Sequence, residues 1–196
     1  MSTWTSKTRS LPLILLLAGC TLEPGAIAAP GQTRAIAVLG GAMTVAAPPG
    51  YCVDKQSARQ QADGAVVLLG RCRRGSSHPA AVISVTIGEA GSAGIVADGG
   101  TAIAAFFQTS GGRAALSRTD SADSVKIVQA ASSDGVFALR IVEAGVGDYW
   151  RAIFGLSGRL VTLSVQGPTG SKLNPATGRA LLAASLAAMR KANPPG

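Results

Sequence analysis

The sequence predicts an α+β domain in which an antiparallel sheet of six or seven strands is covered by two main helices. Three observations support this fold class. Short apolar or alternating segments of strand length recur along the chain, separated by glycine-containing turns. Two segments, one central and one at the C-terminus, carry apolar residues at helical spacing. Aromatic residues make up only 4% of the chain, so the core must be built from Val, Ile, Leu and Ala.

Four strands are predicted in the first half of the domain. The first two surround Gly40 and Gly41, and the proline-glycine turn at 48–50 ends the second. A polar stretch at 55–63 precedes an uninterrupted apolar run, and the fourth segment alternates apolar and polar residues as a half-buried strand does. The predicted strands are 35–39, 42–46, 65–69 and 81–87.

The second half is predicted to contain a helix, a four-stranded meander and a final helix. The first helix, 99–110, has apolar residues at helical spacing and ends at Gly111 and Gly112. The last two strands form a hairpin because a tight glycine turn joins them. The final helix, 176–192, carries basic residues in its last turn, where their positive charge interacts favourably with the helix dipole. The predicted strands are 125–130, 136–143, 149–156 and 160–166.

Two aromatic residues stand next to each other in the third strand of this meander. Adjacent side chains on a strand point to opposite faces, so Tyr149 and Trp150 cannot share a layer. We expect at least one of them to be a core residue, which leaves the other as a candidate to line a groove.

The first twenty residues have the three-part layout of a secretory signal. Lys7 and Arg9 precede an apolar run at 11–18, which is shorter than the roughly 20 residues that a membrane-spanning helix needs. The run ends at Leu17-Ala18-Gly19-Cys20, which resembles the lipobox of bacterial lipoproteins. The sequence therefore predicts a lipoprotein signal peptide at 1–19, a flexible tether at 20–33 and a single globular domain at 34–196. The alternative is an ordinary signal peptide that leaves a cysteine near its cleavage site.

Lipid on Cys20 would anchor the processed protein to a membrane. Each buried methylene of an acyl chain such as palmitate contributes about 0.8 kcal/mol, and two or more chains make the anchoring stable. Thr21 follows the cysteine, and by resemblance to known lipoprotein sorting a residue other than Asp there permits export to the outer membrane. We expect the domain at the periplasmic face of the outer membrane, with inner-membrane anchoring as the less favoured alternative.

Cys52 and Cys72 are the cysteines that remain when lipidation uses Cys20. In an oxidising compartment this pair predicts one disulfide. Closing a loop of that length contributes roughly 3 kcal/mol in the chain-entropy model. A metal site formed by the two cysteines and His78 is the alternative, but no CxxC pair is present and a fourth ligand is not identified.

The chain is basic, with a formal net charge of +8. Arg71, Arg73 and Arg74 cluster around Cys72 and form a candidate anion-binding site, because guanidinium groups bind phosphate and carboxylate in bidentate fashion. In the predicted compartment such anions are lipid headgroups, lipopolysaccharide phosphates or cell-wall carboxylates, and nucleic acid is excluded. A solvated, solubilising cluster is the alternative interpretation.

No set of catalytic residues is recognisable. A nucleophile would need an activating base, and His78, the only histidine, lies in a predicted exposed loop. No GxSxG motif surrounds a serine, and most carboxylates lie in predicted turns. The glycine-rich segment 167–172 lacks the spacing of a phosphate-binding loop. We therefore expect no enzymatic activity, no cofactor and no metal, with a hydrolase that uses His78 and a carboxylate as the alternative.

One local pattern resembles known families. The segments Leu39-Gly40-Gly41-Ala42 and Pro49-Gly50-Tyr51, followed by Asp54, Arg59 and Asp63, resemble the opening of the fold shared by the photosystem II extrinsic protein PsbP and the Mog family of Ran-binding import factors. This resemblance implies a PsbP-like fold and transfers no function, because neither partner fits an exported lipoprotein. Residues 50–72 also resemble uncharacterised secreted proteins of alphaproteobacteria.

Together these features predict a membrane-anchored periplasmic lipoprotein that acts as a non-enzymatic binding or accessory module of the cell envelope. The expected partner is an envelope protein or an anionic envelope component. Besides the hydrolase, a purely structural subunit of an envelope complex remains open.

Overall fold

The computed structural model describes residues 32–97 and 100–195, together with Met1. The predicted signal peptide, the lipobox, Cys20 and all but the end of the predicted tether lie outside these residues. None of the helices in the described part of the chain is long and apolar enough to cross a membrane.

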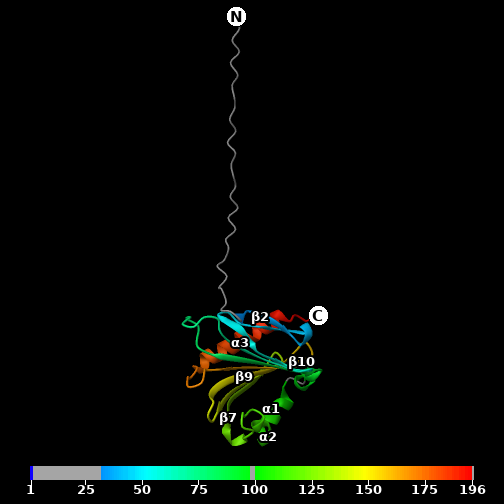
Figure 1. Cartoon of the computed structure of the whole chain (residues 1–196). Coiled ribbons are helices and arrows are strands. Elements are labelled where there is room, and N and C mark those ends of the chain that lie inside the picture. The colour runs from blue at the N-terminus through cyan, green and yellow to red at the C-terminus, as the bar shows by residue number, and fades with distance from the viewer. Residues whose placement is uncertain (2–31, 98–99, 196) are drawn as a thin grey trace.

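In the described residues, an antiparallel sheet of eight strands forms the centre of the domain. Figure 1 shows this sheet with its covering elements. The strand order is β1-β4-β5-β6-β10-β9-β8-β7, and β1 has only two residues. The seven longer strands confirm the predicted α+β class with its antiparallel sheet. The strands are β1 (Gln32–Thr33), β4 (Tyr51–Gln60), β5 (Ala65–Arg71), β6 (Val82–Ala90), β7 (Val125–Ser133), β8 (Val136–Glu143), β9 (Gly147–Leu156) and β10 (Arg159–Gln166).

The sheet consists of two meanders joined side by side. β4, β5 and β6 form the first meander, and β7 to β10 form the second. β10 pairs with β6, with Val165 opposite Ile83 and Leu163 opposite Val85. β10, the last strand in the chain, pairs with β6 in the middle of the sheet. The second meander therefore runs outward from β10, and β7 lies at the edge of the sheet.

The two faces of the sheet have separate covers. The helix α3 (Pro175–Ala192) and the hairpin of β2 (Ala35–Val38) and β3 (Met43–Ala46) pack on one face. On the other face, α1 (Thr101–Gln108) and α2 (Ser110–Ala114) pack near β7, β8 and β9. Short 3-10 helices complete the connections at Leu39–Gly41, Ser92–Val96 and Ala122–Ser124.

Tyr149 and Trp150 point to opposite faces, as predicted. Tyr149 belongs to the core beneath α1, and Trp150 belongs to the core beneath α3. Both side chains are buried.

α3 begins and ends at residues with clear local roles. The side chain of Asn174 accepts hydrogen bonds from the amides of Ala176 and Thr177, which is a capping arrangement worth about 1 kcal/mol. Pro175 occupies the first turn, where its missing N–H costs nothing. At the other end, Asn193 bonds to both the amide and the carbonyl of Thr44 and so ties the helix to β3.

The predicted helix over 99–110 is wrong in its extent. The structure has two helices, α1 and α2, separated by Thr109 in an extended conformation. The hydroxyl of Thr109 accepts from the amide of Gly112 at 2.9 Å and caps α2. Gly111 and Gly112 therefore lie inside the second helix rather than ending the first.

Two other boundaries also need correction. No strand was predicted between 46 and 65, but β4 runs from Tyr51 to Gln60 and includes the first six residues of the polar stretch at 55–63. An irregular register between Asp54 and Arg59 hides the alternation that would identify a strand. The predicted tether reached Thr33, whereas Gln32 and Thr33 form β1 and pair with Asp54 and Val53.

Candidate functional site

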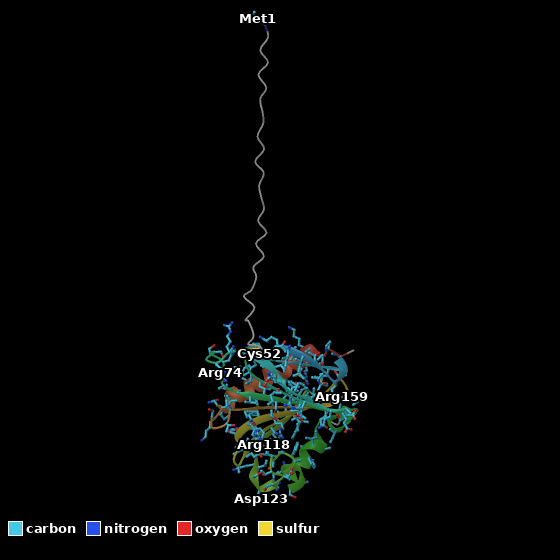
Figure 2. The ribbon with its side chains drawn as sticks, viewed as in Figure 1. Met1, Cys52, Arg74, Arg118, Asp123 and Arg159 are labelled. Carbon is cyan, nitrogen blue, oxygen red and sulfur yellow. A yellow bond between two sulfur atoms is a disulfide. The ribbon has the colours of Figure 1, made fainter. Side chains whose placement is uncertain are left out.

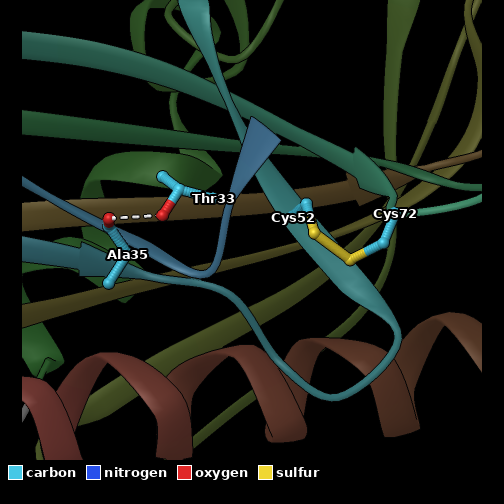
Figure 3. Close-up of a disulfide and its surroundings, with 4 residues drawn as sticks. All are labelled: Thr33, Ala35, Cys52 and Cys72. Atoms are coloured by element: carbon cyan, nitrogen blue, oxygen red, sulfur yellow. Dashed lines mark hydrogen bonds between the residues drawn. A yellow bond between two sulfur atoms is a disulfide. The ribbon is translucent and has the colours of Figure 1, made fainter. Parts of the chain in front are cut away.

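Cys52 and Cys72 form a disulfide that joins the start of β4 to the residue after β5 (Figure 3). Their Cα atoms lie 4.9 Å apart, and the backbone amide of Cys72 donates to the carbonyl of Gly50 at 3.1 Å. This pairing rules out the alternative in which both cysteines bind a metal. In the described residues, no group of three or more His, Cys, Asp or Glu side chains could hold a metal ion.

The arginine loop, residues 71–79, follows directly from this disulfide. Arg71 donates to the carbonyl of His78 at 3.4 Å, and the hydroxyl of Tyr51 donates to the carbonyl of Pro79 at 2.7 Å. Burial raises the pKa of Tyr51, and the positive charge of Arg71 partly offsets this effect. The first contact closes the loop, and the second attaches its end to the start of β4.

Arg73 and Arg74 are exposed at the turn of the arginine loop. Within the described part of the chain, neither guanidinium has a hydrogen-bond or ion-pair partner. Arg74 lies at the same side of the molecule as Cys52, whereas Asp123 lies at the opposite side (Figure 2). Two of the three predicted anion-binding residues are therefore available to a ligand, while Arg71 is engaged in holding the loop.

His78 packs against a turn rather than beside a nucleophile. Its ring covers Gly50, at φ 82°, where a Cβ would collide with the imidazole. The ring centroid of Tyr51 lies 6.1 Å away. No carboxylate or hydroxyl group of the described residues forms a hydrogen bond with the imidazole.

An apolar hollow, which we call the α3 groove, lies between α3 and the outer strands β7, β8 and β9. Its floor is a row of three alanines, Ala131, Ala138 and Ala152, that lie directly opposite one another on β7, β8 and β9. Larger side chains on either side of this row leave a hollow of about 150 Å³. Leu182 and Leu186 of α3 form its wall.

The α3 groove continues into a more polar hollow of about 450 Å³. Trp150 borders both hollows, and its indole N–H donates to the carbonyl of Pro175 at 2.8 Å. Arg140 lies at this end and pairs with Asp148 at 2.6 Å. Arg179 also borders both hollows, is exposed, and has no hydrogen-bond or ion-pair partner among the described residues.

A second cleft, the β7 cleft, runs along the outer edge of the sheet. Six consecutive residues of β7, from Val125 to Ala130, border it. Phe107, Gln108 and Arg113 from α1 and α2 form the opposite wall of this hollow of about 440 Å³. Arg113 donates to the carbonyl of Gln108 at 2.9 Å, which fixes its position in the wall.

Glu143 forms a buried polar cluster that the sequence did not reveal. One carboxylate oxygen accepts from the amide of Arg118 at 2.7 Å, and the other accepts from the hydroxyl of Tyr149 at 3.1 Å. The same hydroxyl also lies 3.2 Å from the carbonyl of Leu116. Burial is the main cause that raises the pKa of Tyr149 to about 12. The cluster attaches the segment after α2 to the sheet.

Only part of these sites could be predicted from the sequence. It identified the arginine cluster because Arg71, Arg73 and Arg74 lie close together in the chain, and it left one of Tyr149 and Trp150 as a candidate to line a groove. It could not identify the α3 groove, because the alanine row depends on the register of three neighbouring strands, and an irregularity in β7 shifts that register. β7 also shows no sequence signal that it would lie at the edge of the sheet.

Comparison with known proteins gives a distant similarity of fold. No family model and no curated protein matches the chain. Two solved structures are similar, one of the Ran-binding protein Mog1p from Saccharomyces cerevisiae and one of a point mutant of Mog1. Each has a TM-score of 0.48 and 16% sequence identity over 82% of this chain, and the matches cover 93% and 94% of the Mog1 chains. What Mog1 binds is not carried over to this chain.

Proposed function

We propose that this chain is a membrane-anchored, non-enzymatic binding module of the bacterial cell envelope. The lipobox at Leu17–Cys20 supports the anchor, with lipid on Cys20 and the domain at the periplasmic face of the outer membrane. The observation that carries the binding role is the α3 groove, an apolar hollow that opens beside an unpaired arginine.

The composition of the α3 groove suits ligand binding. Binding sites in proteins are mostly apolar hollows with a few polar groups that fix the orientation of the ligand. Here the alanine row leaves the space, Trp150 and two leucines offer apolar surface, and Arg179 supplies a charge at the rim. The same residues offer no nucleophile or general base, so binding fits the site better than catalysis does.

The position of β1 supports an orientation on the membrane. β1 pairs with β4 directly beside Cys52, so the chain from the predicted lipid anchor reaches the domain at the disulfide. Arg73 and Arg74 follow that disulfide and would face the anionic membrane surface. The α3 groove lies among β7, β8 and β9, on the half of the sheet away from β1, where it remains accessible to a partner.

The anchor is tested by fractionating cells that express the full chain or its Cys20→Ala variant. We expect the wild type in the outer-membrane fraction, with a mass increase that corresponds to acylation. The variant should lose that mass increase and leave the membrane. Wild-type protein without acyl chains would overturn this part of the proposal.

The binding role is tested by affinity purification of the full chain from cross-linked envelopes. Ala138→Leu places a larger side chain on the floor of the α3 groove, and Ala62→Leu makes the same change on an exposed turn as a control. We expect a specific partner that is lost with Ala138→Leu and retained with Ala62→Leu. A partner that binds both variants equally would place the binding surface elsewhere.

A further inference from the structure

We propose that β7 binds an extended, acidic segment of a partner protein, which adds to the sheet as a further antiparallel or parallel strand. This inference rests on the proposed function and names the partner class and the binding mode. Main-chain hydrogen bonds would supply affinity, and the hollows on either side of β7 would select the side chains.

β7 has the geometry that strand addition needs. It is the last strand in the order of the sheet, it has nine residues, and no described strand lies beyond it. An edge strand offers a row of main-chain N–H and C=O groups that are not used in the sheet. The β7 cleft is bordered by six consecutive residues, so the main chain itself faces the hollow. Gln129, Ala130 and Ala131 are all exposed.

The two flanking hollows lie on opposite faces of this edge. The β7 cleft extends beneath α1 and α2, while the α3 groove lies on the face that carries Gln129 and Ala131. Successive side chains of an added strand point to alternate faces. One set of partner side chains would therefore enter the β7 cleft, and the other set would enter the α3 groove.

Charge identifies the partner as acidic. Arg113 and Lys126 line the β7 cleft, Arg179 lines the α3 groove, and neither lining includes an Asp or Glu among the described residues. Arg140 is neutralised by Asp148, which leaves these three cations to attract a ligand. A second copy of this chain would bring the same three cations into opposition, so an acidic partner fits better than self-association.

An irregularity in β7 explains why the edge is not a general site of aggregation. The register with β8 shifts between Ile127 and Gln129, and the extra residue, Val128, has 45% of its surface exposed. Bulges of this kind protect edge strands from unspecific pairing. A partner must bend with the bulge or stop beside it, which restricts the segments that fit.

The test uses the full chain in detergent and four fluorescent nine-residue peptides. Three alternate valine with glutamate, glutamine or lysine, and the fourth is the glutamate peptide with proline at its centre. Fluorescence anisotropy gives the dissociation constants, and amide hydrogen exchange reports protection of residues 125–131. We expect the glutamate peptide to bind at least tenfold more tightly than the lysine and proline peptides, and to slow exchange in β7 at least tenfold.

Two protein variants with equal loss of charge complete the experiment. Arg113→Gln, Lys126→Gln and Arg179→Gln together should weaken binding of the glutamate peptide at least tenfold. The matched control combines Arg34→Gln, Lys55→Gln and Arg59→Gln, which are exposed and lie away from β7, and should leave binding within twofold. Failure of the glutamate peptide to bind, equal binding of the lysine peptide, or binding without protection of β7 would each overturn the proposal. Loss of the envelope partner in Ala138→Leu would still support the α3 groove in those cases, so the two failures are distinguishable.

Discussion

Glu143 is buried to 3% exposure at the end of β8, and each of its carboxylate oxygens has a hydrogen-bond partner. A buried carboxylate is often a candidate for acid-base chemistry. Here its partners are the amide of Arg118 and the hydroxyl of Tyr149, which both belong to the framework of the domain. Glu143 therefore contributes to stability, because it provides hydrogen-bond partners for two polar groups where water is excluded.

Tyr149 should make stability depend on pH in the alkaline range. Its pKa is raised from the model-peptide value of 10.0 to about 12, so the folded protein keeps the phenolic proton when the unfolded chain has lost it. The contribution of Tyr149 to the free energy of unfolding is complete below pH 10 and is lost as pH rises through 12. We expect the free energy of unfolding to fall by up to about 1.4 kcal/mol per pH unit in this interval. Urea denaturation across the interval measures the slope.

Tyr149→Phe is the control for this prediction. It should remove the part of the slope that belongs to Tyr149, and it should lower the neutral-pH stability by about 1 to 2 kcal/mol because Glu143 loses a partner. Equal slopes in the wild type and the variant would show that other groups cause the pH dependence.

At the scale of elements, alternation of apolar and polar residues predicted most strands to within a few residues. β8 has the predicted bounds, because Phe137, Leu139 and Ile141 lie on one buried face and its register with β9 is regular. β4 was missed, because its second half carries polar residues throughout and its register with β5 is irregular. The break between α1 and α2 was missed because Thr109 caps a helix inside what resembles one continuous pattern.

The disulfide should stabilise the joint between β4 and β5. Replacing both cysteines, Cys52→Ser with Cys72→Ser, should lower the free energy of unfolding by about 3 kcal/mol, because the unfolded chain regains the freedom of the closed loop. Urea denaturation with and without reductant measures this. Reductant should lower the stability of the wild type and leave the variant unchanged. If reductant leaves the stability of the wild type unchanged, the stabilising role of the Cys52–Cys72 disulfide is contradicted.

Close packing of α3 on β9 depends on Gly178. A Cβ at this position would lie 2.9 Å from Cδ1 of Trp150. We expect Gly178→Leu to lower the free energy of unfolding by about 2 to 3 kcal/mol, since the helix must move away from the indole. Ala176→Leu lies on an exposed position of the same helix and should change stability by less than about 0.5 kcal/mol. Thermal denaturation compares the two, and equal effects would contradict this packing.

At the scale of the whole molecule, the domain has different surfaces at its two sheet edges. β1 brings the N-terminal segment to one edge, next to the disulfide and the exposed Arg73 and Arg74. The α3 groove and the β7 cleft lie toward the other edge. This separation fits a protein that faces a membrane with one edge and a partner with the other. It was not accessible from the sequence, because it depends on the order of strands in the sheet.

The membrane-facing edge should bind anionic vesicles. Each basic residue near an anionic surface contributes about 1 kcal/mol, so Arg73→Gln with Arg74→Gln should weaken vesicle binding of residues 32–196 by roughly thirtyfold. Co-sedimentation with vesicles that contain phosphatidylglycerol measures the loss. Arg113→Gln with Lys126→Gln removes the same charge near β7 and should have little effect. Equal losses in both variants would mean that only net charge matters.

The central claim is that a partner occupies the α3 groove, and site-specific photo-cross-linking in living cells tests it most directly. A photoreactive amino acid is placed at Ala183, which lines the α3 groove, and in a separate control at Ala62, on the exposed turn after β4. We predict one discrete adduct from position 183, none from position 62, and loss of that adduct when Ala138→Leu is added. No adduct from position 183, or the same adducts from both positions, would contradict the claim.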